Sequence, residues 1–172
     1  MAADPLAGRV ARFGELRGNP DLFLDTAIPA YARTVWSLIG PNVGEDAADA
    51  VAVPPDGFNL AVIHAEPDMG AGLHDHTTVE VFMALEGRWV IVYGAEGEHE
   101  LVLERFDVVS VPPGVMRGFR NAGTEAAHLL AVVGGTDAGR LTWHPRVIEE
   151  AHRHGRSLDE RGFIVGEPLV EM

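Results

Sequence analysis

Residues 72–87 read GLHDHTTVEVFMALEG, and this stretch decides the fold expected for the chain. Its two histidines and first carboxylate after them, at positions 74, 76 and 80, share one parity, so on an extended strand they point to the same face. The segment from Thr77 to Leu85 is rich in β-branched and apolar residues, which favours a strand. Two imidazoles and one carboxylate suit a divalent metal ion. The stretch therefore predicts a metal site formed by His74, His76 and Glu80.

The composition fits one ordinary globular domain. The chain has 172 residues, of which 47% are apolar and 23% charged. It contains no cysteine, which excludes disulfides, thiolate metal sites and cysteine nucleophiles. The apolar runs are far too short to cross a membrane, and the first residues lack the pattern of a signal peptide. We therefore expect a cytoplasmic protein that does not bind membranes.

The charge argues against a nucleic-acid partner. The formal net charge is −13, and no cluster of lysine and arginine offers a basic footprint for phosphates. The acidity is read first as an aid to solubility. The expected partner is thus a small-molecule substrate.

Short strands separated by turn residues follow one another along most of the chain. The strands are expected at residues 34–39, 58–64, 77–85, 89–93, 99–103, 108–111 and 128–133, with another leading through Phe119-Arg120 into a turn. This spacing is typical of a sandwich or barrel. A short helix is expected within residues 21–28, and Pro145 opens an amphipathic helix that runs to about His154 and stops at Gly155.

Two motifs resemble those of the cupin superfamily. The first is His74, His76, three residues, Glu80, six residues and Gly87. The second motif of that family reads Gly, five residues, Pro-x-Gly, two residues, His, three residues, Asn; here the corresponding residues are Phe106, Pro112-Pro113-Gly114, Arg117 and Asn121. The resemblance covers roughly residues 58–134. It implies an all-β, double-stranded β-helix of the small RmlC-like jelly-roll type, with a divalent ion (Fe, Mn, Ni or Zn) at the first motif and a homodimer as the common assembly.

With that resemblance, the chain divides into three parts. Residues 1–31 are expected to form an N-terminal arm that packs on the barrel, residues 32–143 the cupin barrel, and residues 144–172 a C-terminal helix and tail. Asp68 and Phe106 stand where the two motifs usually begin with glycine. Arg117 replaces the second-motif histidine, which is the usual third imidazole ligand in the family.

Arg117 leaves more than one outcome open, because arginine does not ligate metals. In one, His74, His76 and Glu80 hold the ion and Arg117 orients an anionic substrate beside it. In another, the guanidinium repels the cation and the barrel works without metal; a third outcome is a barrel with no binding function. His64 and His128 lie on predicted strands and could complete the ligand set, although a non-ligand role is favoured for each. A second His-x-His, His152 to His154, lies in the predicted helix and is expected to be solvated.

Further cavity residues follow if Glu86-Gly87 is a two-residue hairpin turn. Ala84 would then face Trp89, Phe82 would face Ile91, and Glu80 would face Tyr93. Phe82 and Trp89 become candidate substrate-binding residues, although core packing is the simpler role for Trp89. Tyr93 becomes a candidate acid or base beside Glu80.

The opposite face of the same strand is also apolar and needs a cover. It comprises Val79, Val81, Met83 and Leu85. The N-terminal arm, the Pro145 helix or a second subunit could supply that cover.

The sequence thus favours a metal-dependent enzyme that acts on a small anionic or oxygenated organic molecule. Dioxygenase, decarboxylase, lyase and isomerase chemistry all occur in the family it resembles, so the reaction stays open. The alternative is a metal-free cupin that binds, isomerises or cyclises a small anionic ligand with Arg117, Glu80 and Tyr93. The sequence has no helix-turn-helix signal before the barrel, which argues against a transcription regulator.

Overall fold

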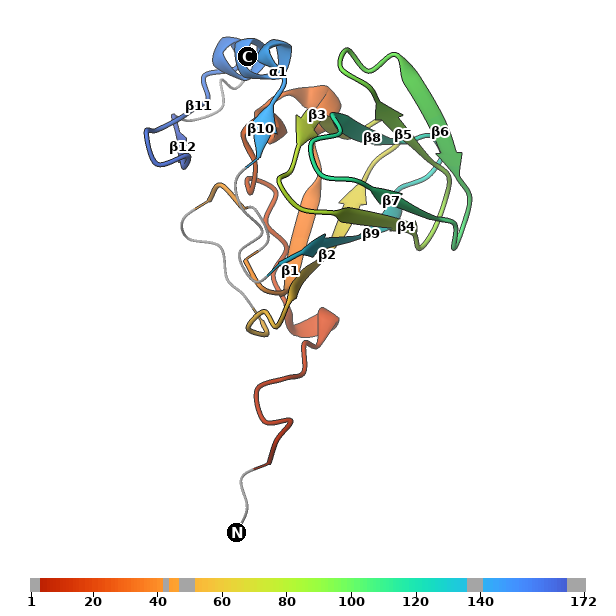
Figure 1. Ribbon diagram of the computed structural model, residues 1–172, viewed down its shortest axis with the longest axis vertical. Helices are drawn as coiled ribbons and strands as arrows, with labels where there is room; N and C mark the ends of the chain where they lie inside the picture. Colours follow the sequence, from red (N-terminus) through yellow and green to blue (C-terminus); the bar gives the residue numbers. More distant parts are fainter. Residues whose placement is uncertain (1–3, 42–43, 47–51, 136–140, 167–172) are drawn as a thin grey trace.

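Two five-stranded antiparallel sheets face each other and form the body of the protein (Figure 1). The computed structural model describes residues 4–41, 44–46, 52–135 and 141–166. The first sheet has the order β1-β2-β9-β4-β7 and the second β10-β3-β8-β5-β6. The strands of the first sheet are β1 (Thr34–Ile39), β2 (Phe58–Ala65), β9 (Ala127–Gly134), β4 (Glu80–Ala84) and β7 (Val108–Val111). Those of the second are β10 (Thr142–Trp143), β3 (Gly70–Asp75), β8 (Arg117–Asn121), β5 (Trp89–Tyr93) and β6 (His99–Leu103).

Alternation of side chains along each strand builds the core between the sheets. In β9 every second residue is buried, and its inward positions are taken by small or branched apolar residues. Beside them in the same sheet, Phe82 of β4 packs edge to face on Phe119 of β8 in the other sheet, with ring centroids 5.3 Å apart. Phe119 packs in the same way on Trp89 of β5, with ring centroids 5.9 Å apart. The chain is therefore an all-β double-stranded β-helix, as the sequence predicted.

The later part of the N-terminal segment packs on one end of the barrel together with the segment after it, whereas residues 4–15 are mostly exposed. Three 3₁₀ turns precede β1: η1 (Phe13–Glu15), η2 (Leu24–Ala27) and η3 (Pro29–Tyr31). Leu22, Leu24 and Ile28 from this region are buried in the core. After β10, helix α1 (Pro145–Arg153) buries Val147 and Ala151, and a small two-stranded sheet follows, formed by β11 (Ser157–Leu158) and β12 (Ile164–Val165). None of the helices in the described part of the chain is long and apolar enough to span a membrane.

The predicted hairpin between β4 and β5 is wrong. Strand β4 pairs with β7 and β9 in one sheet, whereas β5 pairs with β6 and β8 in the other. Residues 85–88 therefore cross from one sheet to the other, with Gly87 at a φ of +65° and the indole Nε1 of Trp89 donating to the carbonyl of Glu86. Because β4 and β5 lie in opposite sheets, their inward side chains meet between the sheets. In a hairpin these side chains would lie on one face of a single sheet.

Asp68 and Phe106, which stand where the family motifs begin with glycine, both have left-handed backbones. Their φ values are +64° and +72°, and they are the only non-glycine residues with positive φ in the described segments. The backbone amide of Asp68 donates to the carbonyl of Asn121, and that of Phe106 to the carbonyl of Ala84. The turns have thus kept the geometry that favours glycine, at a conformational cost of about 1–2 kcal/mol for a residue such as phenylalanine.

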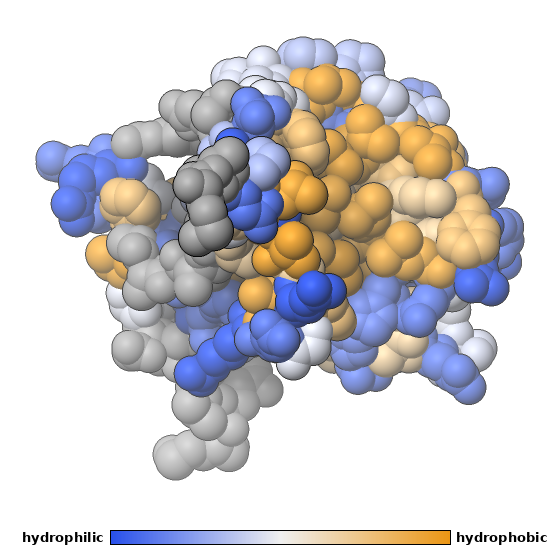
Figure 2. All heavy atoms as spheres, turned by 90° about the horizontal axis from the view of Figure 1, so that it is seen from below, coloured by the Kyte–Doolittle hydropathy of each residue, from blue (hydrophilic) through white to orange (hydrophobic). Residues whose placement is uncertain are grey.

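The outer face of the first sheet is largely apolar, and its strands present no Asp, Glu, Lys or Arg there. Figure 2, which views the molecule from below, shows a broad apolar patch there. One row of paired residues crosses all five strands: Trp36, Val62, Leu130, Met83 and Val108. The only Asp, Glu, Lys or Arg in these five strands is Glu80, which points inward. Among the described residues, the N-terminal arm reaches this face through Phe13, whose ring lies 5.1 Å from that of Trp36, while α1 packs on η2 at another side of the barrel.

We propose that a second copy of the chain covers this face, because the two other candidate covers leave most of it open. Two copies with a net charge of −13 each meet with least repulsion where neither presents a charge. A glutamate in place of Met83 would put a charge in that interface. Met83→Glu is therefore expected to convert a dimer to a monomer at micromolar concentration, measured by sedimentation velocity.

Val102→Glu is the matched control, because Val102 is exposed on β6 of the other sheet. It should leave the dimer intact. A wild-type protein that sediments as a monomer at tens of micromolar would refute the proposal.

Candidate metal centre

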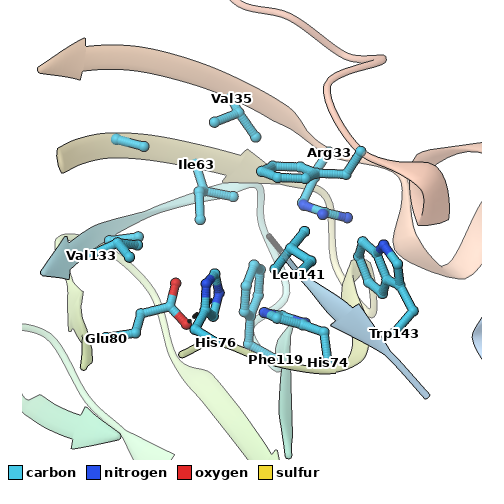
Figure 3. Close-up of a pocket in the computed structure, with 13 residues that line it drawn as sticks. Arg33, Val35, Ile63, His74, His76, Glu80, Phe119, Val133, Leu141 and Trp143 are labelled. Atoms are coloured by element: carbon cyan, nitrogen blue, oxygen red, sulfur yellow. Dashed lines mark ion pairs between the residues drawn. The ribbon is translucent and has the colours of Figure 1, made fainter. Parts of the chain in front are cut away.

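Three potential metal ligands meet at one end of the barrel, between the sheets (Figure 3). His74 lies on β3, His76 follows the end of that strand, and Glu80 opens β4 in the opposite sheet. All three side chains are buried, and one nitrogen or oxygen from each lies within 4.8 Å of the others. The predicted trio is therefore brought together in the barrel interior.

The reason for this convergence differs from the one that the sequence suggested. The three residues do not share one extended strand, because β3 ends at Asp75 and β4 begins at Glu80. The chain crosses between the sheets over residues 76–79, and the amide of Gly114 donates to the carbonyl of His76 to hold this crossing. The histidines thus approach from one sheet and the carboxylate from the other.

His74 has a fixed orientation and a fixed tautomer. Its Nδ1 lies 2.8 Å from the carbonyl oxygen of Gly72, which can only accept, so Nδ1 carries the proton. Nε2 is left with its lone pair exposed to the site, as in a metal ligand supported by a backbone carbonyl. The ring also packs against Trp143, its ladder partner on β10, at a centroid distance of 5.2 Å.

His76 is buried without a hydrogen-bond partner. Neither of its ring nitrogens has one among the residues that the structure describes, although Nε2 lies 3.4 Å from Oε2 of Glu80. Burial lowers the pKa of His74 to about 3, and burial, with His74 and Arg117 nearby, also lowers the pKa of His76 strongly. Both imidazoles are therefore neutral at physiological pH, the state in which they bind metals.

Arg117 is paired with Glu80. Its Nε and Nη2 lie 2.9 and 2.8 Å from the same carboxylate oxygen, Oε2, and its Nη1 donates to the carbonyl of Val115. Burial raises the pKa of Glu80 and the guanidinium opposes that rise, while burial lowers the pKa of Arg117. Oε1 receives no hydrogen bond from the described residues. The pair leaves this oxygen to face a ligand.

A cavity of about 40 Å³ opens beside these groups. On that measure a single water needs about 10–15 Å³, so the space holds an ion with two or three water-sized groups. His74, His76, Glu80 and Arg33 supply its polar lining. Its other walls are apolar: Phe23, Val35, Ala61, Ile63, Phe119, Ala131, Val133, Leu141 and Trp143.

The residues added to the site by the hairpin prediction lie elsewhere. Phe82 and Trp89 are fully buried in the core and do not line the cavity. Tyr93 is the ladder partner of Arg117, but its ring packs on His99 at 5.2 Å and it does not line the cavity either. Their proposed roles in binding and catalysis gain no support from this placement.

His64 and His128 also lie away from the metal ligands. They are ladder partners on β2 and β9, with rings 5.0 Å apart, on strand positions that alternate with the inward ones. Nδ1 of His128 donates to the exposed carboxylate of Glu86, 2.6 Å away. His152 lies in α1 and is exposed, as expected of the second His-x-His.

Arg33 and Trp143 are site residues that the sequence did not indicate. Arg33 immediately precedes β1, and Trp143 belongs to a two-residue strand that periodicity cannot reveal. Both reach the cavity only because the N-terminal segment and β10 close the end of the barrel. No local pattern marks that closure.

Comparison with known proteins identifies the barrel. The family described as a cupin domain matches residues 61–133. No curated protein matches the sequence. An oxalate oxidase structure aligns with a TM-score of 0.56 and 16% identity, covering 81% of this chain and 64% of that one. The polyketide cyclase RemF from Streptomyces resistomycificus aligns with a TM-score of 0.54 and 16% identity, covering 78% and 83%.

A cupin-like protein from Thermotoga maritima aligns with a TM-score of 0.51 and 21% identity, covering 72% of this chain and 84% of that one. The fold and the buried cluster define a single β-barrel with a ligand set fit for a metal. Residues 61–133 of this barrel match the cupin domain family, and the rest of the chain lies outside that match. At these identities the solved structures establish the shared fold alone.

Glu45 ties the wall of the cavity to the N-terminal segment. Its Oε1 accepts from the indole Nε1 of Trp143 at 2.7 Å, and its Oε2 accepts from the amide of Leu24 at 2.6 Å. Burial raises the pKa of Glu45 to about 7, although both hydrogen bonds oppose the rise. The folded protein therefore holds a proton on Glu45 at pH values where the unfolded chain has lost it.

The raised pKa of Glu45 predicts that the folded protein loses stability as pH rises. Below pH 4.5 the carboxyl is protonated in both states, and as pH rises through 7 the folded state loses about 3 kcal/mol relative to the unfolded state. His74 and His76 have lowered pKa values and act in the opposite direction below pH 6.5, so the comparison requires a variant. Glu45→Gln should remove the Glu45 contribution, measured as the wild-type minus variant free energy of unfolding between pH 4.5 and 8.

Glu149→Gln, at an exposed position of α1, is the control and should give a difference that does not depend on pH. A flat difference for Glu45→Gln would contradict the prediction.

Proposed function

We propose that this protein is a metal-dependent cupin enzyme that acts on a small anionic or oxygenated organic molecule. His74, His76 and Glu80 would hold a divalent ion in a two-histidine, one-carboxylate set. Such an ion acts as a Lewis acid on a bound oxygen atom, or as an oxygen site if it is ferrous iron.

The observation that carries this proposal is the state of His76. A neutral imidazole buried with both nitrogens unpaired among the described residues costs about 1–3 kcal/mol for each unsatisfied group. A metal ion bound to one nitrogen removes part of that cost. His74 Nε2 and a carboxylate oxygen of Glu80 would give the ion two further ligands.

Arg117 would act on the ligand set through Glu80. By contacting Oε2 it fixes the carboxylate and supplies a positive charge, which opposes the rise in the pKa of Glu80 that burial causes. The substrate-orienting role expected for Arg117 from the sequence is not supported by these contacts, since the groups that it touches belong to the protein.

The size of the cavity supports a small substrate, or a small reacting end of a larger one. Among the structures with the same fold, one is an oxalate oxidase and another a polyketide cyclase. These names show that the barrel supports enzymes with different reactions, which favours an enzyme here without selecting the reaction.

Metal content tests the proposal directly. Wild-type protein produced in metal-replete medium and dialysed should retain close to one equivalent of a divalent metal by elemental analysis. His74→Ala and His76→Ala should each lower the retained metal at least tenfold, because each removes one of three ligands. Circular dichroism should show that both variants keep the strand signal.

His152→Ala is the matched control, since His152 belongs to the other His-x-His and lies exposed on α1. It should retain the wild-type amount of metal. A wild type that is metal-free after metal-replete growth would rule the proposal out.

Arg117→His should increase metal affinity. The substitution frees Oε2 of Glu80 and places an imidazole at the position where the cupin motif has its third histidine. We expect Zn²⁺, used as a probe, to bind at least tenfold more tightly, measured by competition with a chromophoric chelator.

Arg117→Met frees Oε2 without adding a ligand and should fall between the wild type and Arg117→His. Equal Zn²⁺ affinities for the two variants would mean that residue 117 does not reach the ion.

The pairing of Glu80 with Arg117 also favours one alternative, a metal-free cupin. Arg117 supplies the counter-charge that a metal would otherwise provide, so the site is electrostatically satisfied without an ion. Such a protein would bind, isomerise or cyclise a small anionic ligand with Glu80 and His76 at the cavity; Tyr93, the third group considered from the sequence, does not line it. Persistent anion binding by metal-free protein would favour this alternative.

A further inference from the structure

We infer that Arg33 is the anion-binding residue of this site and that the cavity takes a carboxylate, which accepts a hydrogen bond from Arg33 Nε. This inference deepens the proposed function, since it assigns the ligand class of the same cavity. It replaces Arg117, which the sequence suggested for this role, with a residue that the sequence did not indicate.

The contacts of Arg33 leave its Nε available to a ligand. Nη2 lies 2.9 Å from Oδ1 of Asp25, and Nη1 donates to the carbonyls of Tyr31 and Gly70. Nε has no hydrogen-bond partner among the described residues, although the side chain is only 3% exposed. A buried donor without a partner is costly, and a ligand oxygen would satisfy it.

Arg33 faces the cavity from the wall opposite Glu80 (Figure 3). Its guanidinium lies 4.9 and 5.8 Å from the ring centroids of Phe23 and Phe119, so aromatic faces hold its plane. A ligand in the cavity therefore meets potential metal ligands on one side and the side chain of Arg33 on the other.

The charges around the cavity favour an anion. Asp25 pairs with Arg33, and Glu80 pairs with Arg117. A divalent ion held by the cluster then adds two positive charges to a buried site. An anion is the ligand that offsets such a charge.

The remaining walls select a small carboxylate with an apolar body. Nine of the lining residues are apolar, and the cavity has room for two or three water-sized groups beside an ion. Acetate matches these requirements and serves as the probe, with acetamide as its uncharged counterpart.

The first experiment needs no substitution. In ¹⁵N-labelled wild-type protein loaded with Zn²⁺, acetate should shift the Nε–H resonance of Arg33 in a saturable way, while acetamide at the same concentrations should not. An Arg33 resonance that stays unchanged at saturating acetate would overturn the inference.

The second experiment uses Arg33→Lys, which keeps a positive charge near Asp25 and removes the planar Nε–H donor. We expect acetate affinity, measured by calorimetry, to fall at least tenfold with the metal content unchanged. The matched control is Arg156→Lys. Arg156 is also buried, also lacks a partner at Nε among the described residues, and also pairs with an aspartate, Asp21, but it does not line the cavity.

Arg156→Lys should bind acetate within twofold of the wild type. An equal loss of acetate affinity in both variants would overturn the inference, because such a loss would reflect a general destabilisation of the protein. Should Arg33→Lys fail to fold, the resonance shift in the wild type decides alone. A wild type that stays metal-free after metal-replete growth and still binds acetate at Arg33 would refute the metal-dependent function and keep the inference. Metal binding with no acetate effect at Arg33 would refute the inference and leave the metal-dependent function intact.

Discussion

The ion pair between Glu80 and Arg117 is the interaction on which the site depends, because it joins the two sheets at the end of the barrel where the histidines lie. Glu80 belongs to β4 in one sheet and Arg117 to β8 in the other, and both are almost fully buried. Removing one partner from such a pair costs about 3–5 kcal/mol, since it leaves an uncompensated charge in a low dielectric. The pair therefore fixes the position of the carboxylate that faces the cavity.

A second buried ion pair, between Asp25 and Arg33, holds the opposite wall of the cavity in place. Asp25 lies on η2 and Arg33 just before β1, and Oδ2 of Asp25 also accepts from the amide of Gly72 on β3. The N-terminal segment is thereby attached to the strand that presents His74. Glu45 adds a third polar link, from this segment to Trp143. These buried polar contacts explain how segments with little regular structure can form a defined wall.

The sequence predicted the barrel and the metal ligands because both are local signals. Alternation along the strands and turn residues between them mark the sheets, and the cupin motif places two histidines and a glutamate within seven residues. The sequence could not predict which sheet each strand joins, so the pairing of β4 with β5 was wrong and the roles given to Phe82, Trp89 and Tyr93 rested on a hairpin that does not exist. Arg33 was missed because only long-range contacts bring it to the cavity.

The two departures from glycine show how a motif can change its residues and keep its geometry. At Asp68 and Phe106 the backbone keeps the left-handed conformation that glycine adopts without cost. The ring of Phe106 lies on the surface, 4.4 Å from the guanidinium carbon of Arg105, so its bulk disturbs no packing.

Arg117 is a different kind of departure. It replaces a neutral ligand with a cation, and the fold accommodates this only because Glu80, a motif residue itself, lies within hydrogen-bond distance. The turns thus preserve the barrel, while the arginine changes the electrostatics of the site inside it.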